Sequence, residues 1–381
     1  MSPLMRIGVN TRLLLKDKLE GIGWFTYRTL ERIVKQHPEH EFIFFFDRNY
    51  DPSFVFADNV TPVVVRPQAR HPFLFYAWLE WSIPFMLKKH KVDVFLSPDG
   101  FGSLSTKVPT CIVIHDLAFE HYPEHLKFSH RLYWQRYSPL FARKAKRIVT
   151  VSTYSKEDIS KRYRIAPEKI DVSYNGAHDE YQPLSWQEKE KVKEQYAEGC
   201  EYFVFAGALH PRKNIVNLLK AFMAFKERQR SDMKLVIVGR MAWKYEEVIE
   251  MKENMPFKDD VKWVGYMNVD ELSKVIGGAY AMVYASLFEG FGIPILEALK
   301  CNVPAIVSNT SSMPEVVGEA GLLVDPEDHF DIAAKMEQLY KDENLRAQLI
   351  KKAPEQVEKF TWERAANVLW ENVEKAAKNA D

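Results

Sequence analysis

Short apolar runs recur along the whole chain and alternate with longer segments of helical periodicity. Parallel strands that are buried on both faces read as continuous apolar runs, and their connections are usually helices. The sequence therefore predicts an α/β protein built on parallel sheets. The expected strands cover residues 6–9, 41–46, 60–65, 92–96, 111–114, 147–151 and 170–174 in the first half, and 202–206, 234–238, 261–264, 282–285, 305–307 and 322–324 in the second.

A polar stretch at residues 175–183 interrupts this alternation with a glycine and a proline. Both residue types break helical and strand periodicity, so this stretch is the expected linker. A chain of 381 residues is long enough for two domains of ordinary size, each with its own core. We expect one domain at residues 1–177 and a second at residues 178–360.

Charge balances over the whole chain, with 52 basic and 52 acidic residues, but not within each half. Residues 1–177 carry 26 Lys and Arg against 18 Asp and Glu, whereas residues 178–381 carry 26 against 34. A basic first half suits an anionic acceptor or an anionic membrane face, and it equally suits simple attraction between two oppositely charged halves. A nucleic acid is not among the expected partners.

A glycine-rich turn follows the expected strand 282–285 and ends in Pro294. Proline suits the first helical position, where its missing N–H costs nothing. The N–H groups of Phe291, Gly292 and Ile293 would then lie at the positive end of a helix. Such an end favours an anion, and glycine allows a phosphate to approach the main chain.

Two carboxylates, Glu289 and Glu297, flank this turn at a spacing of eight positions. Carboxylates accept hydrogen bonds from hydroxyl groups, so both could hold a sugar or a ribose. The alternative is that the two acids only complement the helix N-terminus.

Two adjacent cations, Arg212 and Lys213, follow the expected strand 202–206 and precede a helix that Asn214 could cap. Because the helix dipole disfavours positive charge there, a bound anion explains the pair better than chance. A guanidinium can fork onto phosphate oxygens, and an ammonium acts on them as a point charge. A solvated basic loop is the alternative. Together with the glycine-rich turn, the pair predicts a diphosphate site.

The first half offers two further candidates at the carboxyl ends of strands, where ligands bind in open α/β sheets. Gly21 and Gly23 are expected in a loop before a helix that starts near Trp24. They could bring N–H groups to a phosphate or an acceptor, or they could form an ordinary turn. His115 follows the strand 111–114 and could contact substrate, or it could be a hydrogen-bonded structural histidine.

In combination these motifs resemble retaining glycosyltransferase family 4, over nearly the whole chain. The motifs are Glu289-x7-Glu297, Gly207-x4-Arg212-Lys213-Asn214, Gly21-Ile-Gly23, His115-Asp116 and Val151-Ser-Thr-Tyr-Ser155. The resemblance implies the GT-B fold, in which two Rossmann-like domains face across a cleft that holds a nucleotide sugar. It also implies that the last helix, at about residues 361–381, crosses back to the first domain.

The resemblance further implies transfer of a sugar with retention of the anomeric configuration. The expected catalytic residues are His115 at the transferred sugar, Arg212 and Lys213 at the leaving diphosphate, and Glu289 at the sugar hydroxyls. The expected donor-binding residues are Gly21, Gly23, Arg240, Met267, Phe291, Gly292, Ile293 and Glu297, with Glu297 at the ribose and the base resting near Arg240 and Met267. No covalent nucleophile is assigned.

We expect no metal and no other cofactor. No Asp-x-Asp motif follows a strand, and the three cysteines are isolated from one another, with no CxxC motif and no Cys–His spacing that indicates a zinc site. The donor would be a nucleotide sugar and the acceptor a glycan or a lipid-linked molecule. The His115-Asp116-Leu117 form, with Tyr122-Pro123 downstream, is most similar to α-mannosyltransferases that use GDP-mannose. UDP-sugars remain the alternative.

Residues 73–87 form an aromatic segment that is too short to span a membrane and is followed by Lys88, Lys89 and Lys91. It could lie on an anionic membrane, line an acceptor groove, or pack in the core of the first domain. The first six residues lack the pattern of a signal peptide. We therefore expect a cytoplasmic protein, with peripheral contact at the inner face of the membrane as an alternative.

Three other functional classes compete. A nucleotide-sugar epimerase would share the cleft but would not be expected to combine Arg212-Lys213 with Glu289-x7-Glu297. A Rossmann dehydrogenase is disfavoured, because no Gly-x-Gly-x-x-Gly follows the first strand. A non-catalytic nucleotide-sugar-binding protein is consistent with the same motifs.

Overall fold

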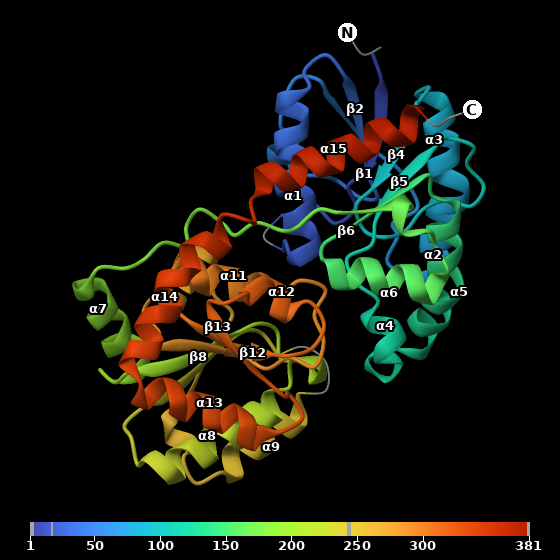
Figure 1. Cartoon of the computed structure of the whole chain (residues 1–381). Coiled ribbons are helices and arrows are strands. Elements are labelled where there is room, and N and C mark those ends of the chain that lie inside the picture. The colour runs from blue at the N-terminus through green and yellow to red at the C-terminus, as the bar shows by residue number, and fades with distance from the viewer. Residues whose placement is uncertain (1–3, 17, 242–244, 379–381) are drawn as a thin grey trace. The chain divides into compact units, whose positions relative to one another are not determined.

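The chain forms two compact units in a computed structural model that describes residues 4–16, 18–241 and 245–378 (Figure 1). The first unit runs to Asn175 and includes the C-terminal segment from Trp362, and the second runs from Gly176 to Thr361. The division lies two residues before the expected one. Residues 1–3, part of the segment considered for a signal peptide, and 379–381, the end of the last expected helix, lie outside the described residues.

The first unit is built on a seven-stranded parallel sheet with the strand order β3-β2-β1-β4-β5-β6-β7. Ile7 in the central strand pairs with Phe42 on one side and Val94 on the other. The reversal of order at the first strand makes this a doubly wound sheet. The strands are β1 (Arg6–Asn10), β2 (Glu41–Phe46), β3 (Val60–Val64), β4 (Val94–Ser97), β5 (Thr110–Val113), β6 (Arg147–Thr150) and β7 (Ile170–Val172).

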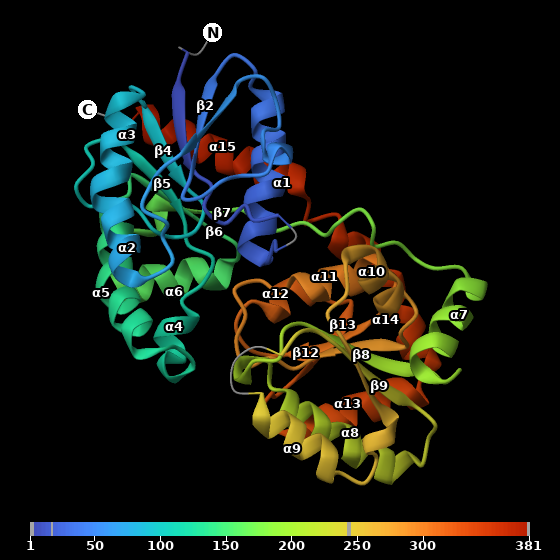
Figure 2. The same cartoon turned by 180° about the vertical axis from the view of Figure 1, so that it is seen from behind.

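Helices cover both faces of this sheet (Figures 1 and 2). The C-terminal helix packs on the first helix and on strands β4 to β7, and the ring of its Trp370 stacks on His37 with centroids 4.0 Å apart. The helices are α1 (Gly21–Gln36), α2 (Pro72–Ala77), α3 (Ile83–Lys89), α4 (Ala118–His121), α5 (Phe128–Lys144), α6 (Thr153–Tyr163) and α15 (Trp362–Lys378), with a π turn η2 (Trp78–Ser82) and 3-10 turns η1 (Pro52–Phe54), η3 (Pro123–His125) and η4 (Pro167–Lys169).

The aromatic segment 73–87 divides into α2, η2 and α3, and only part of it packs in the core. Trp78 is fully buried and donates its indole N–H to the carbonyl of Val65 at 2.9 Å. Glu80 also faces inward, because its carboxylate accepts the N–H groups of Leu104 and Ser105 at 2.7 and 2.9 Å. The expected core packing therefore holds for one face of the segment, and the other face is exposed.

The second unit is built on a six-stranded parallel sheet with the order β10-β9-β8-β11-β12-β13. Its strands are β8 (Tyr202–Ala206), β9 (Lys234–Val238), β10 (Val261–Gly265), β11 (Ala281–Tyr284), β12 (Ala305–Ser308) and β13 (Gly321–Val324). Its helices are α7 (Trp186–Ala197), α8 (Ile215–Gln229), α9 (Glu246–Asn254), α10 (Val269–Gly277), α11 (Ile293–Lys300), α12 (Met313–Val317), α13 (His329–Lys341) and α14 (Glu343–Val357), with 3-10 turns η5 (Pro211–Lys213) and η6 (Lys258–Asp260).

The structure confirms all thirteen expected strands, with ends that differ by two residues or fewer. The two parallel-sheet units are the fold class that the sequence predicts. In each unit the loops that carry the candidate site residues leave the carboxyl ends of the strands, where an open α/β sheet binds its ligands.

Candidate functional site

Two glycines bring neighbouring backbones together at the carboxyl end of the second sheet. Gly239 donates its N–H to the carbonyl of Gly265 at 2.8 Å, and Gly207 donates to Val238 at 2.9 Å. Gly239 has a φ of +155°, and a Cβ there would stand 1.8 Å from the carbonyl oxygen of Gly207. Any larger residue at 239 would push these two turns apart.

The turn η5 holds Arg212 and Lys213 between β8 and α8. The N–H of Arg212 donates to the imidazole of His210 at 3.2 Å, and its carbonyl accepts the N–H of Leu287 at 2.8 Å. The basic turn is therefore tied to the loop that follows β11, far away in the sequence. This long-range tie argues against a loose, solvated basic loop.

Asn214 does not cap α8 through its side chain, contrary to the expectation from its type. It adopts a left-handed conformation with a φ of 60°, and its amide donates to the carbonyls of Ala285 and Pro326 at 2.9 and 2.7 Å. Those carbonyls belong to two other loops at the same sheet edge. Asn214 therefore holds the loops together instead of satisfying the helix end.

The carboxylate of Glu289 bridges the two cations. Its Oε2 lies 2.9 Å from Nη1 of Arg212, and its Oε1 lies 2.6 Å from Nζ of Lys213. Lys213 also donates to the hydroxyl of Tyr284 at 2.5 Å. The structure thus brings together three of the four expected catalytic residues in one cluster.

The carboxylate of the cluster is buried, its two cations are partly buried, and the cluster carries a net positive charge. Glu289 is 7% exposed. Burial alone would raise the pKa of Glu289, but the charges of Arg212 and Lys213 outweigh it and lower that pKa to about 2. Burial raises the pKa of Tyr284, so its phenol stays neutral. Two cations against one carboxylate leave one unit of positive charge at a site of low dielectric, which favours an anion.

The glycine-rich turn enters α11 as the sequence predicts, with a small shift. Ile293 is the first helical residue and Pro294 the second, and Gly292 precedes them with a φ of +98°. No side chain caps this helix end. The hydroxyl of Ser312 donates to the carbonyls of Glu289 and Phe291, both at 2.9 Å, and thereby fixes the turn.

Glu297 lies in the second half of α11 in an environment unlike that of Glu289. It is 6% exposed, and its side chain accepts a hydrogen bond from Tyr181. Burial raises the pKa of Glu297 to about 8, with Glu180 adding to the rise and Lys300 opposing it. The structure therefore places Glu289, and not Glu297, among the cations, and burial favours the protonated form of Glu297.

Arg240 and Met267 follow β9 and β10, at the end of the sheet where a nucleotide base is expected. Arg240 is exposed, and its carbonyl accepts the N–H of Leu209 at 2.9 Å. Met267 is partly buried beside the exposed Tyr266. Both therefore lie on the accessible surface of the second unit.

His115 lies two residues beyond β5 in the first unit. Its Nε2 lies 2.8 Å from the carbonyl oxygen of Pro98. Because a carbonyl can only accept, Nε2 carries the proton and Nδ1 offers a lone pair. Burial lowers the pKa of His115, so the ring is neutral at physiological pH. A neutral ring with this tautomer can accept a hydrogen bond from a hydroxyl group at Nδ1.

Gly21 and Gly23 lie in the first turn of α1 and not in a loop before it. The helix begins three residues earlier than expected. Their N–H groups belong to the helix N-terminus, which carries the positive end of the dipole. Phe25 of the same helix packs edge-on against the ring of His115, with centroids 5.0 Å apart. The structure therefore links α1 with His115.

Sequence reasoning did not identify a buried polar cluster beside His115. Asp99 accepts hydrogen bonds from Asn10 at 3.0 Å and from Nε of Arg12 at 2.5 Å. The guanidinium of Arg12 lies 4.3 Å from the ring centroid of Phe75. Asn10 and Arg12 follow the expected strand 6–9, and Asp99 follows the expected strand 92–96. Their position after strands could have identified them.

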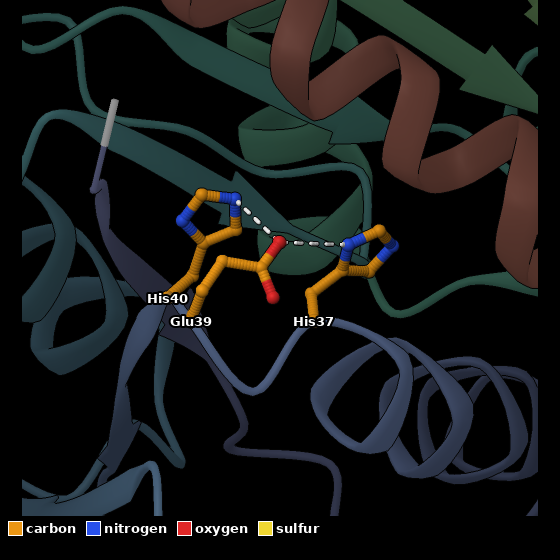
Figure 3. A group of neighbouring side chains, drawn as sticks. All are labelled: His37, Glu39 and His40. Atoms are coloured by element: carbon orange, nitrogen blue, oxygen red, sulfur yellow. Dashed lines mark ion pairs between the residues drawn. The ribbon is translucent and has the colours of Figure 1, made fainter. Parts of the chain in front are cut away.

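Three potential metal ligands meet in the loop between α1 and β2, at the opposite end of the strands (Figure 3). Oε1 of Glu39 lies 3.6 Å from Nδ1 of His37 and 3.5 Å from Nε2 of His40. However, Nδ1 of His40 accepts the N–H of Met5 at 3.2 Å. The proton of a neutral His40 is therefore on Nε2, which donates toward Glu39 and offers no lone pair to a metal.

Models of two protein families match the chain in succession. "Glycosyltransferase Family 4" matches residues 19–181 and "Glycosyl transferases group 1" matches residues 187–356. The O-antigen chain mannosyltransferase B of Escherichia coli is 31% identical over 366 residues, which cover 92% of this chain and 94% of that protein. The chain belongs to glycosyltransferase family 4. It is an enzyme that transfers a hexose, and its family membership decides against an epimerase or a dehydrogenase.

A second mannosyltransferase and two solved glycosyltransferases are also similar to this chain. The O-antigen chain mannosyltransferase RfbU of Salmonella typhimurium is 31% identical over 57% of both chains. The glycosyltransferase WaaG, involved in lipopolysaccharide biosynthesis, superimposes with a TM-score of 0.73 at 16% identity, covering 95% of this chain and 99% of that one. Anabaena HepE in complex with UDP-glucose gives 0.74 at 18% identity, covering 97% and 99%. At these identities the likeness shows the GT-B fold.

Proposed function

We propose that this glycosyltransferase transfers mannose from GDP-mannose, with retention of the anomeric configuration, to a glycan or a lipid-linked acceptor. The cluster of Arg212, Lys213 and Glu289 is the observation that carries the proposal. Its carboxylate is buried, it is tied to the loops that surround it, and it has one more positive than negative charge. A nucleoside diphosphate supplies the anion that such a cluster favours.

The two cations would act most strongly on the leaving group. Departure of the sugar develops negative charge on the diphosphate, and preorganised cations stabilise that charge more in the transition state than in the ground state. Arg212 can fork onto two oxygens, and Lys213 can follow the charge as a point cation. The N–H groups at the start of α11 would add the positive end of a helix dipole.

Glu289 would act on the sugar and orient both cations. Its carboxylate is ionised and can accept hydrogen bonds from sugar hydroxyls while it holds Arg212 and Lys213 in place. From the first unit, His115 would accept a further sugar hydroxyl at Nδ1. Glu297 would bind the ribose, for which it can donate a hydrogen bond as long as it stays protonated.

The choice of mannose rests on the named relatives. Two O-antigen mannosyltransferases share 31% of their aligned residues with this chain, one of them over nearly its whole length. An O-antigen is a polysaccharide, so a glycan under construction is the acceptor that we propose. We also propose a cytoplasmic location with peripheral contact at the membrane, and catalysis without a metal.

A thermal-shift panel of GDP-, UDP- and ADP-sugars tests the donor. A ligand at 100 times its dissociation constant stabilises the folded protein by about 2.7 kcal/mol. We expect GDP-mannose to give the largest shift and to release GDP when a mannose-terminated acceptor is present. A larger shift with a UDP-sugar would mean that the donor is a UDP-sugar and not GDP-mannose. Binding without turnover over a broad acceptor panel would contradict an active transferase.

A further inference from the structure

Exposed apolar side chains gather on two adjoining helical segments of the first unit. Of the fourteen large hydrophobic side chains that are exposed among the described residues, six lie on α2, η2, α3 and α5. Figures 1 and 2 show these helices along the same side of the unit, and α2 contacts α5. The six are Phe73, Leu74, Trp81, Phe85, Phe128 and Leu132, with exposed fractions between 37% and 70%.

The sequence spacing aligns these residues with cations. Trp81, Phe85 and Lys89 recur every fourth residue along one segment, and Phe128, Leu132 and Arg136 do the same along α5. Residues spaced by four lie on one side of a helix. Each segment therefore presents two apolar side chains and then a cation, and we call the two segments together the aromatic-basic face.

A groove of about 640 Å³ lies within this face. Half of its lining residues are aromatic, and the lining includes Phe73, Tyr76, Leu132, Tyr133, Arg136 and Tyr137. An exposed apolar surface of this kind marks a place where another apolar body binds. The groove is too open and too apolar to be a second nucleotide site.

The charge on this face has one sign. The segments α2, η2 and α3 contain Lys88 and Lys89, and their one acid, Glu80, is buried against the loop at Leu104 and Ser105. The helix α5 contains four Lys and Arg, which are Arg131, Arg136, Arg143 and Lys144, and no acid. A surface that combines exposed aromatics with cations, on helices whose one acid is buried, is complementary to anionic headgroups above an apolar layer.

We propose that the aromatic-basic face docks on a lipid bilayer that contains anionic phospholipids. The aromatic side chains would insert at the headgroup level, and the cations would pair with lipid phosphates. No helix in the described ranges is long and apolar enough to cross a membrane, so the contact is interfacial. The inference rests on the proposed function in one respect, because it brings a lipid-linked acceptor within reach of the enzyme.

The same charge pattern argues against a second copy of the chain as the partner. A symmetric dimer through this face would place the cations of one copy against those of the other. Like charges across an interface disfavour association. An anionic lipid surface would not repel these cations.

Vesicle sedimentation tests the proposal. Full-length protein is mixed with vesicles of phosphatidylcholine alone, or of equal parts phosphatidylcholine and phosphatidylglycerol. We expect binding to the anionic vesicles that is at least about tenfold tighter than to the neutral ones and that weakens at high salt. The combined variant Trp81→Gln, Phe85→Gln, Phe128→Gln and Leu132→Gln should lose at least about tenfold of that binding.

A matched control uses exposed aromatics of the second unit, Trp186→Gln with Phe330→Gln, which should bind the vesicles as the wild type does. Equal binding of wild type to both vesicle types, no binding to either, or an unchanged fourfold variant would overturn the proposal. So would a dimer, seen by sedimentation velocity, that the fourfold variant converts to monomer while vesicle binding persists. Nucleotide-sugar binding measured without vesicles is independent of these results, so failure of the proposed function would be recognised separately.

Discussion

Nζ of Lys213 lies 2.6 Å from Oε1 of Glu289, although 76 positions separate the two residues in the chain. The contact joins the loop after β8 to the loop after β11, which are adjacent strands of the second sheet. Because the carboxyl ends of parallel strands meet at one edge, motifs that are remote in sequence can form one site.

Turnover should depend on both cations. Arg212→Ala and Lys213→Ala should each raise the activation barrier by roughly 2.7–4 kcal/mol, the typical cost of removing one preorganised donor. Steady-state rates at saturating donor measure this, with circular dichroism to verify the fold. Lys341→Ala, which removes an exposed lysine on α13, is the control and should leave the rate unchanged. A near-wild-type rate for either site variant would remove that residue from the catalytic machinery.

The two carboxylates should differ in what they bind. Glu289→Ala should leave affinity for the free nucleoside diphosphate intact or increase it, because both cations lose their carboxylate partner, while turnover of the sugar donor falls. Glu297→Ala should weaken the nucleotide sugar and the free diphosphate alike. An interaction with the sugar can be lost only when the sugar is present.

Calorimetry with the nucleoside diphosphate on both variants separates these roles. Equal losses of affinity would mean that the two acids act together on the start of α11, and the division of roles between them would then be dropped.

The free energy of unfolding should decrease as pH rises, because of Glu297. Its folded pKa of about 8 lies above the ordinary 4.5 of glutamate. Between those values the unfolded chain loses the proton while the folded chain keeps it, so the free energy of unfolding decreases as pH rises. Relative to Glu297→Gln, the wild type should lose about 3 kcal/mol of that free energy between about pH 5.5 and 8. Urea denaturation of both proteins at the two pH values measures the difference, and parallel pH profiles would show that Glu297 ionises normally.

Activity should persist in excess EDTA. In the proposed mechanism Arg212 and Lys213 supply the positive charge that a divalent metal could otherwise supply, and the tautomer of His40 turns a proton toward Glu39. Initial rates with and without chelator are the measurement. A rate that collapses in EDTA and returns with Mg²⁺ or Mn²⁺ would refute the metal-free mechanism.

The sheets could be predicted from sequence because their strands are buried on both faces. Phe203, Val204 and Phe205 are fully buried, and such runs stand out without knowledge of their neighbours. The association of Arg212 with Glu289 could also be predicted, since both follow strands of the same expected sheet. The rule that places ligands at the carboxyl ends of strands therefore identified most of the cluster.

Properties that arise from distant partners could not be predicted. The amide of Asn214 binds the carbonyl of Pro326, 112 positions away, which no local capping rule can foresee. The pKa of Glu297 depends on burial and on Tyr181 from the segment that begins the second unit. Trp81 is exposed and lies in a π turn, within a segment whose composition alone suits a core.

The claim that Arg212 and Lys213 bind the donor diphosphate is tested most directly by calorimetry on the Arg212→Ala, Lys213→Ala double variant. The ligands are the nucleoside diphosphate that stabilises the wild type best and the nucleoside that lacks both phosphates. We predict a loss of at least about a hundredfold in affinity for the diphosphate, because charged hydrogen bonds contribute about 1.5–3 kcal/mol each, with nucleoside affinity unchanged. Unchanged diphosphate affinity, or equal losses for both ligands, would contradict the account.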